Sequence, residues 1–407
     1  MSRKTLLNID YALIQGTYWM FYAVAGMFVS VYMLGKGYSN TSIGLVIAVG
    51  NVVAVFVQAV LANITDKAQR LTDITVIKVL IAVLFALTVA VLLIGDKSLL
   101  LTIAYTALIV VHTTLHPFVN SLSFTLEESG EHVSFGIGRS MGSLSAALLG
   151  LAMGYLVTGF GVDVIPFSGL IILVLMEAII IVAGRHHARF RQGGREIPGH
   201  ETGDGEEAVS LTEFVSGNMV FMVMSVGVVA LFFGNVIVEN FTIQIIESIG
   251  GDTEQLGVMI FVMAILEMPA MLFFDRIKKR FSYIFLMRVV AIFFTVKITL
   301  MYLAGSMGVM YAAQACQVLG YGLMFPAMVS FIDDIMSRGE AVRGQAVFTT
   351  AITVGNVLGC IFGGRILDLS TVGTLLLISA MITAAGTILI CCTVSRVKRK
   401  NIERDAV

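Results

Sequence analysis

The sequence predicts an all-α membrane protein with twelve transmembrane helices in two six-helix pseudo-repeats. Hydrophobic residues make up 57% of the 407 residues and charged residues only 13%, whereas an ordinary soluble domain carries roughly 25% charged residues. The mean hydropathy is +0.92. Long apolar runs recur along the chain, and several short features recur about 209 residues apart. Composition therefore places the chain in a bilayer, and the two kinds of recurrence predict the number and grouping of its helices.

Each apolar run has about 20 residues or more, which as a helix crosses roughly 30 Å of hydrocarbon. In the first half of the chain the runs lie at about 10–35, 41–64, 73–95, 98–124, 134–160 and 164–184. In the second half they lie at about 216–246, 254–274, 281–304, 307–332, 344–367 and 371–395. This even number of spans predicts that both termini lie on the same side of the membrane.

The two halves repeat short features at corresponding places. Asp66-Lys67 recurs as Asp275-Arg276, Pro117 recurs as Pro326, and Gly150 with Gly154 recurs as Gly359 with Gly363. A polar segment joins the halves, so we predict a six-helix bundle over 1–184, a cytoplasmic linker over 185–213 and a second six-helix bundle over 214–407. Duplicated helical membrane proteins are typical of secondary transporters.

Lysine and arginine are concentrated on one side of the predicted helices. Because cytoplasmic loops retain positive charge, this side is predicted to be cytoplasmic. Its basic residues include Arg3, Lys4, Lys67, Arg70, Arg185, Arg189, Lys278, Lys279, Arg280, Arg338 and Arg396. The opposite side carries little beyond Lys36 and Lys97. We therefore predict a multi-pass protein of the cell membrane with both termini in the cytoplasm.

Several functional classes find no support in the sequence. The net charge of −1 indicates no nucleic-acid partner. The four cysteines lie inside predicted helices without metal-ligand spacing, and the sequence contains no nucleophile motif or phosphate-binding loop. We therefore expect no enzyme, no cofactor and no metal site. The expected partners are the lipid bilayer, a small-molecule solute and a coupling proton, and we expect the chain to function as a monomer.

Charged residues inside predicted spans are the first candidates for a functional site. They are Arg139, Glu239, Glu267 and Lys297. A charge near the bilayer centre costs at least about 2.5 to 3.5 kcal/mol, so such a residue indicates function by default. The alternative is that these charges pair only to fix the packing of the helices.

The spacing of these residues predicts some of their neighbours. Asn235 lies four residues before Glu239, so the two share one helical face. Arg139 is expected at the depth of Asn120, where the two side chains can meet. Glu267 and Lys297 are expected on neighbouring helices with an axial offset of roughly 10 Å, which leaves a direct ion pair open.

Aromatic and polar side chains form a stripe on the first predicted helix. Tyr11, Gln15, Tyr18 and Tyr22 follow helical spacing. We assign Tyr18 and Tyr22, which lie deeper, to stacking on a sugar or nucleobase. Tyr11 is equally consistent with an aromatic anchor at the membrane interface.

Two further groups of polar residues follow helical spacing. Gln314, Gln317 and Tyr321 form a stripe on the tenth predicted helix. His112 and His116 share a face of the fourth predicted helix. The histidines either titrate near neutral pH or are hydrogen-bonded by neighbouring hydroxyls, and the sequence favours neither.

The Asp66-Lys67 loop, its counterpart in the second half and the six-plus-six organisation resemble the major facilitator superfamily over the whole chain. The loop is degenerate, because two glycines of the family motif are replaced. In that family the acidic and basic residues of this loop help to latch the cytoplasmic gate. The resemblance thus implies gating roles for Asp66, Lys67 and Arg70, and the repeat extends the prediction to Asp275 and Arg276.

Within the superfamily, the segment FGIGRSMG at 135–142 resembles the lactose permease branch of oligosaccharide/proton symporters. There the corresponding arginine binds the sugar, which implies this role for Arg139. The segment TVKI resembles a stretch that holds another functional arginine, which Lys297 replaces.

The sequence also departs from that branch. Ala146 and Asn120 stand in place of its sugar-stacking tryptophan and sugar-binding glutamate, so lactose is not an expected substrate. Gln317 and Gly320 stand in place of its tenth-helix histidine and its proton-carrying glutamate. Glu267, one turn beyond an eighth-helix glutamate of that branch, is our candidate for the proton carrier.

These observations predict a secondary active transporter that works by alternating access. We expect proton-coupled uptake of a small polar solute, such as a sugar, oligosaccharide or nucleoside. Glu267 is the first candidate for the proton carrier and Glu239 the second. The predicted solute-binding residues are Tyr18, Tyr22, Asn120, Arg139, Glu239, Lys297 and Gln317.

Two alternatives remain open at this stage. An exporter of drugs or metabolites by proton antiport fits the Met- and Phe-rich interior. The segment 142–154 lacks the proline of the drug-antiporter motif, which argues against export. A membrane sensor or enzyme without transport activity is the third hypothesis, and the missing catalytic motifs and the intramembrane charges argue against it.

Overall fold

The computed structural model describes residues 2–67, 72–191 and 211–404, and the regular secondary structure in these ranges is helical. Eleven helices in the described part of the chain are long and apolar enough to cross a bilayer, or twelve if one bent pair forms a single span. The chain divides into two compact units. Unit 1 comprises Met1–His200 with Asp252–Ala264, and unit 2 comprises Glu201–Gly251 with Ile265–Val407.

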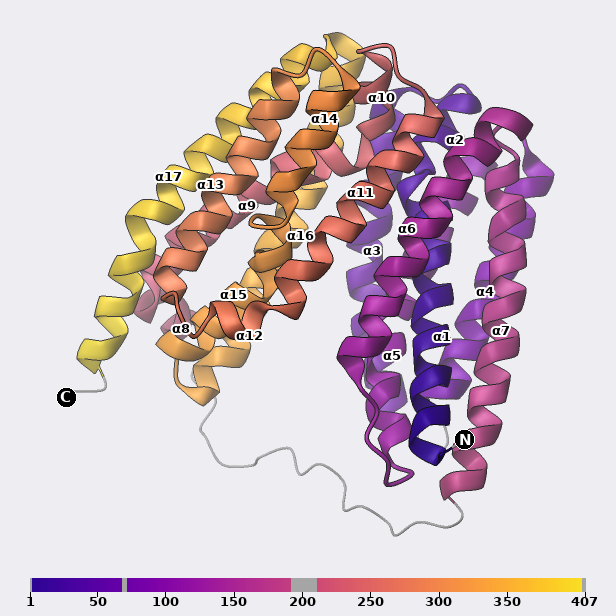
Figure 1. Ribbon diagram of the computed structural model, residues 1–407, viewed down its shortest axis with the longest axis horizontal. Coiled ribbons are helices and arrows are strands. Elements are labelled where there is room, and N and C mark those ends of the chain that lie inside the picture. Colours follow the sequence, from indigo (N-terminus) through magenta and orange to yellow (C-terminus); the bar gives the residue numbers. More distant parts are fainter. Residues whose placement is uncertain (1, 68–71, 192–210, 405–407) are drawn as a thin grey trace. The chain divides into compact units, whose positions relative to one another are not determined.

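Unit 1 contains the helices of the first half of the chain (Figure 1). They are α1 (Arg3–Tyr22), the π-helical η1 (Ala23–Met27), α2 (Val29–Gly35), α3 (Asn40–Lys67), α4 (Asp73–Ile94), α5 (Leu99–Glu127), α6 (Phe135–Phe160) and α7 (Val164–Arg191). Helix α1 packs against α6 and α7, and α5 packs against α3 and α4.

Unit 2 contains more elements, several of them short, and it shares α11 with unit 1. They are α8 (Leu211–Gly217), α9 (Met219–Asn240), α10 (Thr242–Glu247), α11 (Thr253–Leu272), α12 (Phe274–Ile277), α13 (Tyr283–Tyr302), α14 (Met307–Gln314), the 3₁₀ segment η2 (Ala315–Gln317), α15 (Tyr321–Ile335), α16 (Arg338–Leu369) and α17 (Val372–Arg404). The boundary between the units falls within α11. Helix α9 packs against α16 and α17. This repeats the packing of α1 against α6 and α7, as a duplicated chain requires.

Short polar side chains begin many of the helices. Ser98 and Ser134 accept hydrogen bonds at their hydroxyls from the backbone N–H groups of Leu101 and Ile137, and Ser282 does the same at α13. Such caps satisfy N–H groups that have no partner within the helix. The polar residues between apolar runs therefore set where the spans start.

The structure interrupts three spans that the hydropathy pattern predicts to be continuous. The first span, at 10–35, bends by 41° between Arg3–Met27 and α2. The span at 216–246 is broken at Phe241, between α9 and α10. The span at 307–332 contains η2 followed by three non-helical residues before α15. Hydropathy reports the length of an apolar run and not its backbone geometry, so these interruptions have no hydropathy signal.

Local contacts account for two of the interruptions. The Thr242 hydroxyl donates to the carbonyl oxygens of Val238 and Glu239, where it competes with backbone N–H groups. At η1, a Cβ on Gly26 would lie 2.6 Å from the ring of Tyr22, so this ring packs directly on the glycine backbone. π-Helical segments occur frequently at functional sites.

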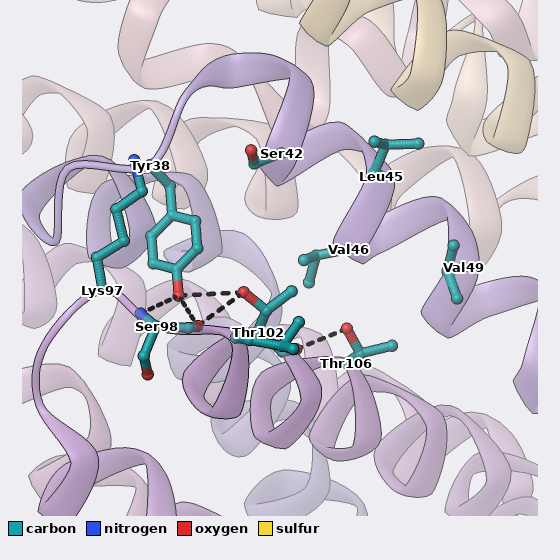
Figure 2. Close-up of a pocket in the computed structure, with 10 residues that line it drawn as sticks. Tyr38, Ser42, Leu45, Val46, Val49, Lys97, Ser98, Thr102 and Thr106 are labelled. Carbon is teal, nitrogen blue, oxygen red and sulfur yellow. Dashed lines mark hydrogen bonds between the residues drawn. The ribbon is translucent and has the colours of Figure 1, made fainter.

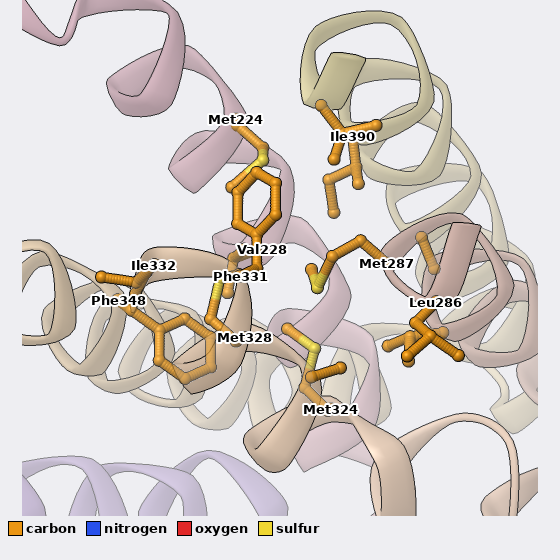
Figure 3. Close-up of a cluster of buried hydrophobic side chains, with 14 of the residues drawn as sticks. Met224, Val228, Leu286, Met287, Met324, Met328, Phe331, Ile332, Phe348 and Ile390 are labelled. Carbon is orange, nitrogen blue, oxygen red and sulfur yellow. The ribbon is translucent and has the colours of Figure 1, made fainter. Parts of the chain in front are cut away.

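Methionine and phenylalanine side chains form the core of unit 2 (Figure 3). Met224, Met287, Met324 and Met328 are fully buried in this cluster beside Phe331. Met fills irregular spaces between helices because its side chain is unbranched and flexible. Much of the Met-rich interior is therefore packing, and these side chains do not form a surface for a solute.

Glycines of α16 allow close contact with α9. A Cβ on Gly359 would lie 2.5 Å from the carbonyl oxygen of Phe233, and one on Gly355 would lie 2.5 Å from that of Val229. Backbone atoms cannot rotate out of the way as a side chain can. The small-xxx-small spacing predicted from the sequence thus forms a helix–helix seam in unit 2.

We expect Gly359→Ala to destabilise the protein by about 1 to 3 kcal/mol, because the added methyl group forces α9 and α16 apart. Thermal unfolding in detergent measures the effect. The matched control is Gly159→Ala in α6, since a Cβ at Gly159 meets no atom within 4 Å. Equal melting temperatures for the two variants would contradict the prediction.

Candidate functional site

A polar cluster in unit 1 joins α1 to α5. The Gln15 amide donates to the Tyr11 hydroxyl at 2.8 Å and to Asn120 Oδ1 at 3.0 Å. Trp19 Nε1 donates to Gln15 Oε1 at 3.2 Å. Asn120 Nδ2 lies 3.2 Å from His116 Nε2. Gln15 thus fixes the position of the predicted site residue Asn120.

Aromatic rings stack beside this cluster. Tyr18 stacks on His112, with a centroid distance of 4.6 Å and an interplanar angle of 9°, and on His116 at 5.5 Å. Tyr22 stacks on His112 at 5.7 Å. The buried Nε2 atom of His112 has no hydrogen-bond partner among the described residues. The cluster therefore combines flat rings with a buried polar atom whose hydrogen bond the described residues do not satisfy.

Arg139 of α6 faces the same cluster. Its guanidinium lies 3.9 Å from the centroid of the Trp19 ring, and its Nη1 donates to Ser143 Oγ at 2.7 Å. A Cβ on Gly142 would lie 2.4 Å from Trp19, so the glycine makes room for the indole. A cation over an aromatic face is stabilised by the ring quadrupole.

The structure places Tyr18, Tyr22, Asn120 and Arg139 in one cluster, and it adds Trp19, which the sequence reasoning missed. The signal was present, because Trp19 lies four residues after Gln15 and is the only tryptophan of the chain. Tyr18 and Tyr22 share a helical face that lies beside Trp19, so the predicted stripe does not include this residue. Only the packing of α6 shows that Trp19 meets Arg139.

Unit 2 contains a second cluster, built around Lys297 of α13. Lys297 Nζ donates to Gln317 Oε1 at 2.5 Å, and Gln317 Nε2 donates to Glu267 Oε1 at 2.6 Å. Lys297 is 4% exposed and Gln317 is 1% exposed. The Gln317 amide therefore joins the ammonium to the carboxylate.

Glu239 belongs to the same cluster. It accepts a hydrogen bond from Asn235 Nδ2 at 2.8 Å, as their shared helical face predicts. Both Glu239 and Glu267 interact electrostatically with Lys297. The cluster thus holds two carboxyl groups and one ammonium, so full ionisation would leave it with a net negative charge. Binding a proton at one carboxyl group removes this charge.

A narrow cavity, too small in this conformation to hold a water molecule, lies next to Lys297. Its walls are formed by residues of α9, α13, η2 and α15, among them Asn235, Phe294, Lys297, Gln317 and Tyr321. A helix that is broken near an intramembrane cavity is a common feature of transporter binding sites. In the sequence, the interruptions that follow Glu239 and Gln317 lie next to residues that line this cavity.

Only part of the predicted gating group is described. Lys67 ends α3 and is exposed. Arg276 is exposed and lies over the Phe273 ring at 5.2 Å. The side chains of Asp66 and Asp275, and the whole of Arg70, fall outside the described part of the structure.

A larger cavity lies at the ends of α3 and α5 in unit 1 (Figure 2). Its volume is about 600 Å³, and hydroxyl groups and apolar side chains both line it. Tyr38 donates to the carbonyl oxygen of Ser98, and Thr102 donates to the Tyr38 hydroxyl. The residues that line it include none of the predicted site residues.

Glu177 is an intramembrane acid that the sequence reasoning also missed. It lies in the middle of α7, Lys78 of α4 is its electrostatic neighbour, and its buried Oε2 atom has no hydrogen-bond partner among the described residues. The rule that selected Glu239 and Glu267 selects Glu177 equally well, since it is the only acid of its span.

Comparison with known proteins identifies the fold and the family. A family model described as the MFS_1 like family matches residues 11–378. The chain belongs to this family of the major facilitator superfamily. This major facilitator chain is 22% identical over 394 residues to the uncharacterized transporter YwbF of Bacillus subtilis, a match that covers 92% of the chain and 91% of YwbF.

Solved structures share the fold of this major facilitator protein. A point mutant of the nucleoside transporter NupG matches with a TM-score of 0.77 at 14% identity, over 95% of this chain and 99% of NupG. A bacterial homologue of the human lysosomal transporter Spinster matches with a TM-score of 0.63 at 13% identity, over 99% of this chain and 98% of that homologue. The predicted major facilitator fold is thus confirmed, and the protein is a multi-pass membrane transporter and not an enzyme.

Proposed function

We propose that this transporter couples proton movement to the uptake of a small polar solute, and that the solute contains a ring, as a nucleoside or a sugar does. The observation that carries the proposal is the buried bridge from Lys297 through Gln317 to Glu267. It keeps a carboxylate inside the membrane-spanning part of unit 2, where binding a proton changes the charge of the site.

The cluster in unit 1 supports the choice of solute. Tyr18, Tyr22 and Trp19 supply aromatic rings, which in this conformation stack on histidines or on Arg139, and Asn120 and Arg139 carry hydrogen-bond donors. Stacking on aromatic rings suits a nucleobase or the apolar face of a sugar. The structural neighbour NupG is a nucleoside transporter, which favours a nucleoside as the first solute to test. We assign Glu239, Lys297 and Gln317 of unit 2 to polar contacts with a solute.

The remaining predictions belong to this proposal. We assign Glu267 as the proton carrier and Glu239 as the second candidate. Asp66, Lys67, Arg70, Asp275 and Arg276 are assigned to a cytoplasmic gate. Both termini face the cytoplasm, the bundles span 1–184 and 214–407, and the protein functions as a monomer. The resemblance to the lactose permease branch stays a prediction.

Reconstitution in liposomes that contain a pH-sensitive dye tests this proposal. Uridine, sucrose and the lipophilic cation tetraphenylphosphonium are added separately, and acidification of the lumen is followed. Acidification on addition of uridine or sucrose supports proton-coupled uptake. Proton movement only with tetraphenylphosphonium would favour the alternative, a drug or metabolite exporter. No proton movement together with facilitated flux of uridine or sucrose would rule out the proposed coupling.

We expect Trp19→Leu to weaken solute binding by roughly tenfold, because it removes both the ring surface and the cation–π contact with Arg139. Isothermal titration with the solute that is active in the liposome assay measures the affinity. Trp19→Phe, which keeps a ring face, is the matched control and is expected to retain most of the affinity. Unchanged binding by Trp19→Leu would remove the unit 1 cluster from the site.

A further inference from the structure

The interruption between α14 and α15 coincides with the residue that bridges Lys297 and Glu267. Gln317 is the last residue of η2, and Gly320 just before α15 has a non-helical backbone with φ −87° and ψ −99°. A 3₁₀ stretch in the middle of a helix often marks a hinge. The bridge and the interruption therefore meet at one side chain.

The chemistry of the amide makes this bridge directional. A glutamine side chain has one end that accepts and one end that donates hydrogen bonds. Lys297 occupies the accepting end at 2.5 Å, and Glu267 occupies the donating end at 2.6 Å. Both bonds involve a charged partner when the lysine and the glutamate are ionised, and such bonds are roughly twice as strong as neutral ones.

Gln314 provides an internal comparison, because it is the same residue type one turn earlier. Both glutamines are 1% exposed. Gln314 makes only a long contact of 3.9 Å with Met301 Sδ, and its Oε1 atom has no hydrogen-bond partner among the described residues. Burial alone thus does not create the bridge, which depends on the position of Gln317.

We propose that Gln317 is the positioning residue through which protonation of Glu267 changes the geometry of the interrupted segment between α14 and α15. When Glu267 binds a proton, its bond from Gln317 Nε2 loses the charge of the acceptor. The carbonyl oxygen of the carboxylic acid can still accept this bond, but a neutral hydrogen bond is only about half as strong. The bridge then weakens and the interrupted segment is released. This inference rests on the proposed role of Glu267 as the proton carrier.

Other ionisable groups surround the bridge and share in its response to pH. Lys297 interacts electrostatically with Glu239, Glu267 and the thiol of Cys316. Tyr321 lines the same cavity. Because several groups respond to acid together, the test uses Glu267→Gln, which removes the charge of Glu267 at any pH.

Pulsed electron–electron double resonance measures the distance between two spin labels placed on either side of the interrupted segment. Spin labels are placed at Val309→Cys in α14 and Val329→Cys in α15, both exposed positions, in the full-length protein with its four cysteines replaced by alanine. The reconstituted protein is measured at acidic and at alkaline pH. We expect two distance populations whose ratio changes by about tenfold or more with pH, as the loss of one charge-assisted bond allows.

The variants separate the proposed bridge from general effects of pH. Glu267→Gln is expected to hold the acidic distance distribution at every pH. Gln317→Leu is expected to abolish the pH dependence, and the matched control Gln314→Leu is expected to retain it. A pH response in Gln317→Leu equal to that of the parent would overturn the inference, and so would its loss in both leucine variants.

The liposome assay on the same labelled parent separates this inference from the proposed function. A distance change that depends on Gln317, without solute-driven proton movement, would support the bridge and reject proton coupling of the solute. Solute-driven proton movement together with a spin-label distance that does not change with pH would support coupling and reject the proposed role of the bridge.

Discussion

Glu267→Gln is expected to abolish uptake of the solute against its gradient, so that the accumulation ratio falls to about one. Glutamine keeps the size and the hydrogen-bonding oxygen of the side chain, but it cannot bind and release a proton in the physiological range. The amide oxygen offers Gln317 Nε2 a neutral acceptor, so the bond is weakened as in the protonated acid but the cluster can still fold. Accumulation in proteoliposomes with an imposed proton gradient measures the effect.

Exchange of labelled for unlabelled solute without a gradient provides the control for this variant. Exchange requires binding and alternating access but no net proton transfer, so we expect Glu267→Gln to retain it. Glu239→Gln is the matched comparison, since Glu239 lies in the same cluster and also interacts with Lys297. Normal accumulation by Glu267→Gln together with its loss in Glu239→Gln would move the role of proton carrier to Glu239.

Lys297→Leu is expected to destabilise the protein by about 3 to 5 kcal/mol, the usual cost of leaving buried charge without its compensating group. Leucine removes the ammonium that interacts with both Glu239 and Glu267, and Gln317 loses the donor at its oxygen. Unfolding of the purified protein in mixed detergent micelles, followed by intrinsic fluorescence, measures the change in the free energy of unfolding.

A second substitution tests the physical reason for this loss. If uncompensated carboxylate charge destabilises Lys297→Leu, then Lys297→Leu combined with Glu267→Gln should recover much of the lost stability. If the lysine contributes only packing, the double variant should be as unstable as Lys297→Leu or less stable. Equal stability of Lys297→Leu and the parent would show that the buried ammonium does not hold the cluster together.

The cluster around Lys297 illustrates which interactions a sequence can predict. Asn235 and Glu239 lie on one helix, so their contact at 2.8 Å follows from helical spacing. Glu267, Lys297 and Gln317 come from three different elements, and only residue types inside apolar runs marked them as candidates. Their connection through one amide depends on the relative rotation and depth of those elements, which no local pattern encodes.

The unit 1 cluster shows the same limit. Helical spacing predicts the stripe that contains Tyr18 and Tyr22, but the stripe has no signal for its partners. Trp19 meets Arg139 because Gly142 of α6 lets the indole approach. This contact depends on the packing of α6 against α1, so reasoning along a single helix cannot find it.

Hydropathy, repeat spacing and residue type are properties of the chain read in order, so they were enough to predict the membrane-spanning all-α architecture, the duplication and the intramembrane charges. Where the spans break and which charged groups meet depends instead on tertiary packing. The π-helical segment η1, the 3₁₀ segment η2 and the bridge through Gln317 became visible only in the folded chain. Contacts between different helices are fixed only when the helices pack, since packing sets the rotation and depth of each helix.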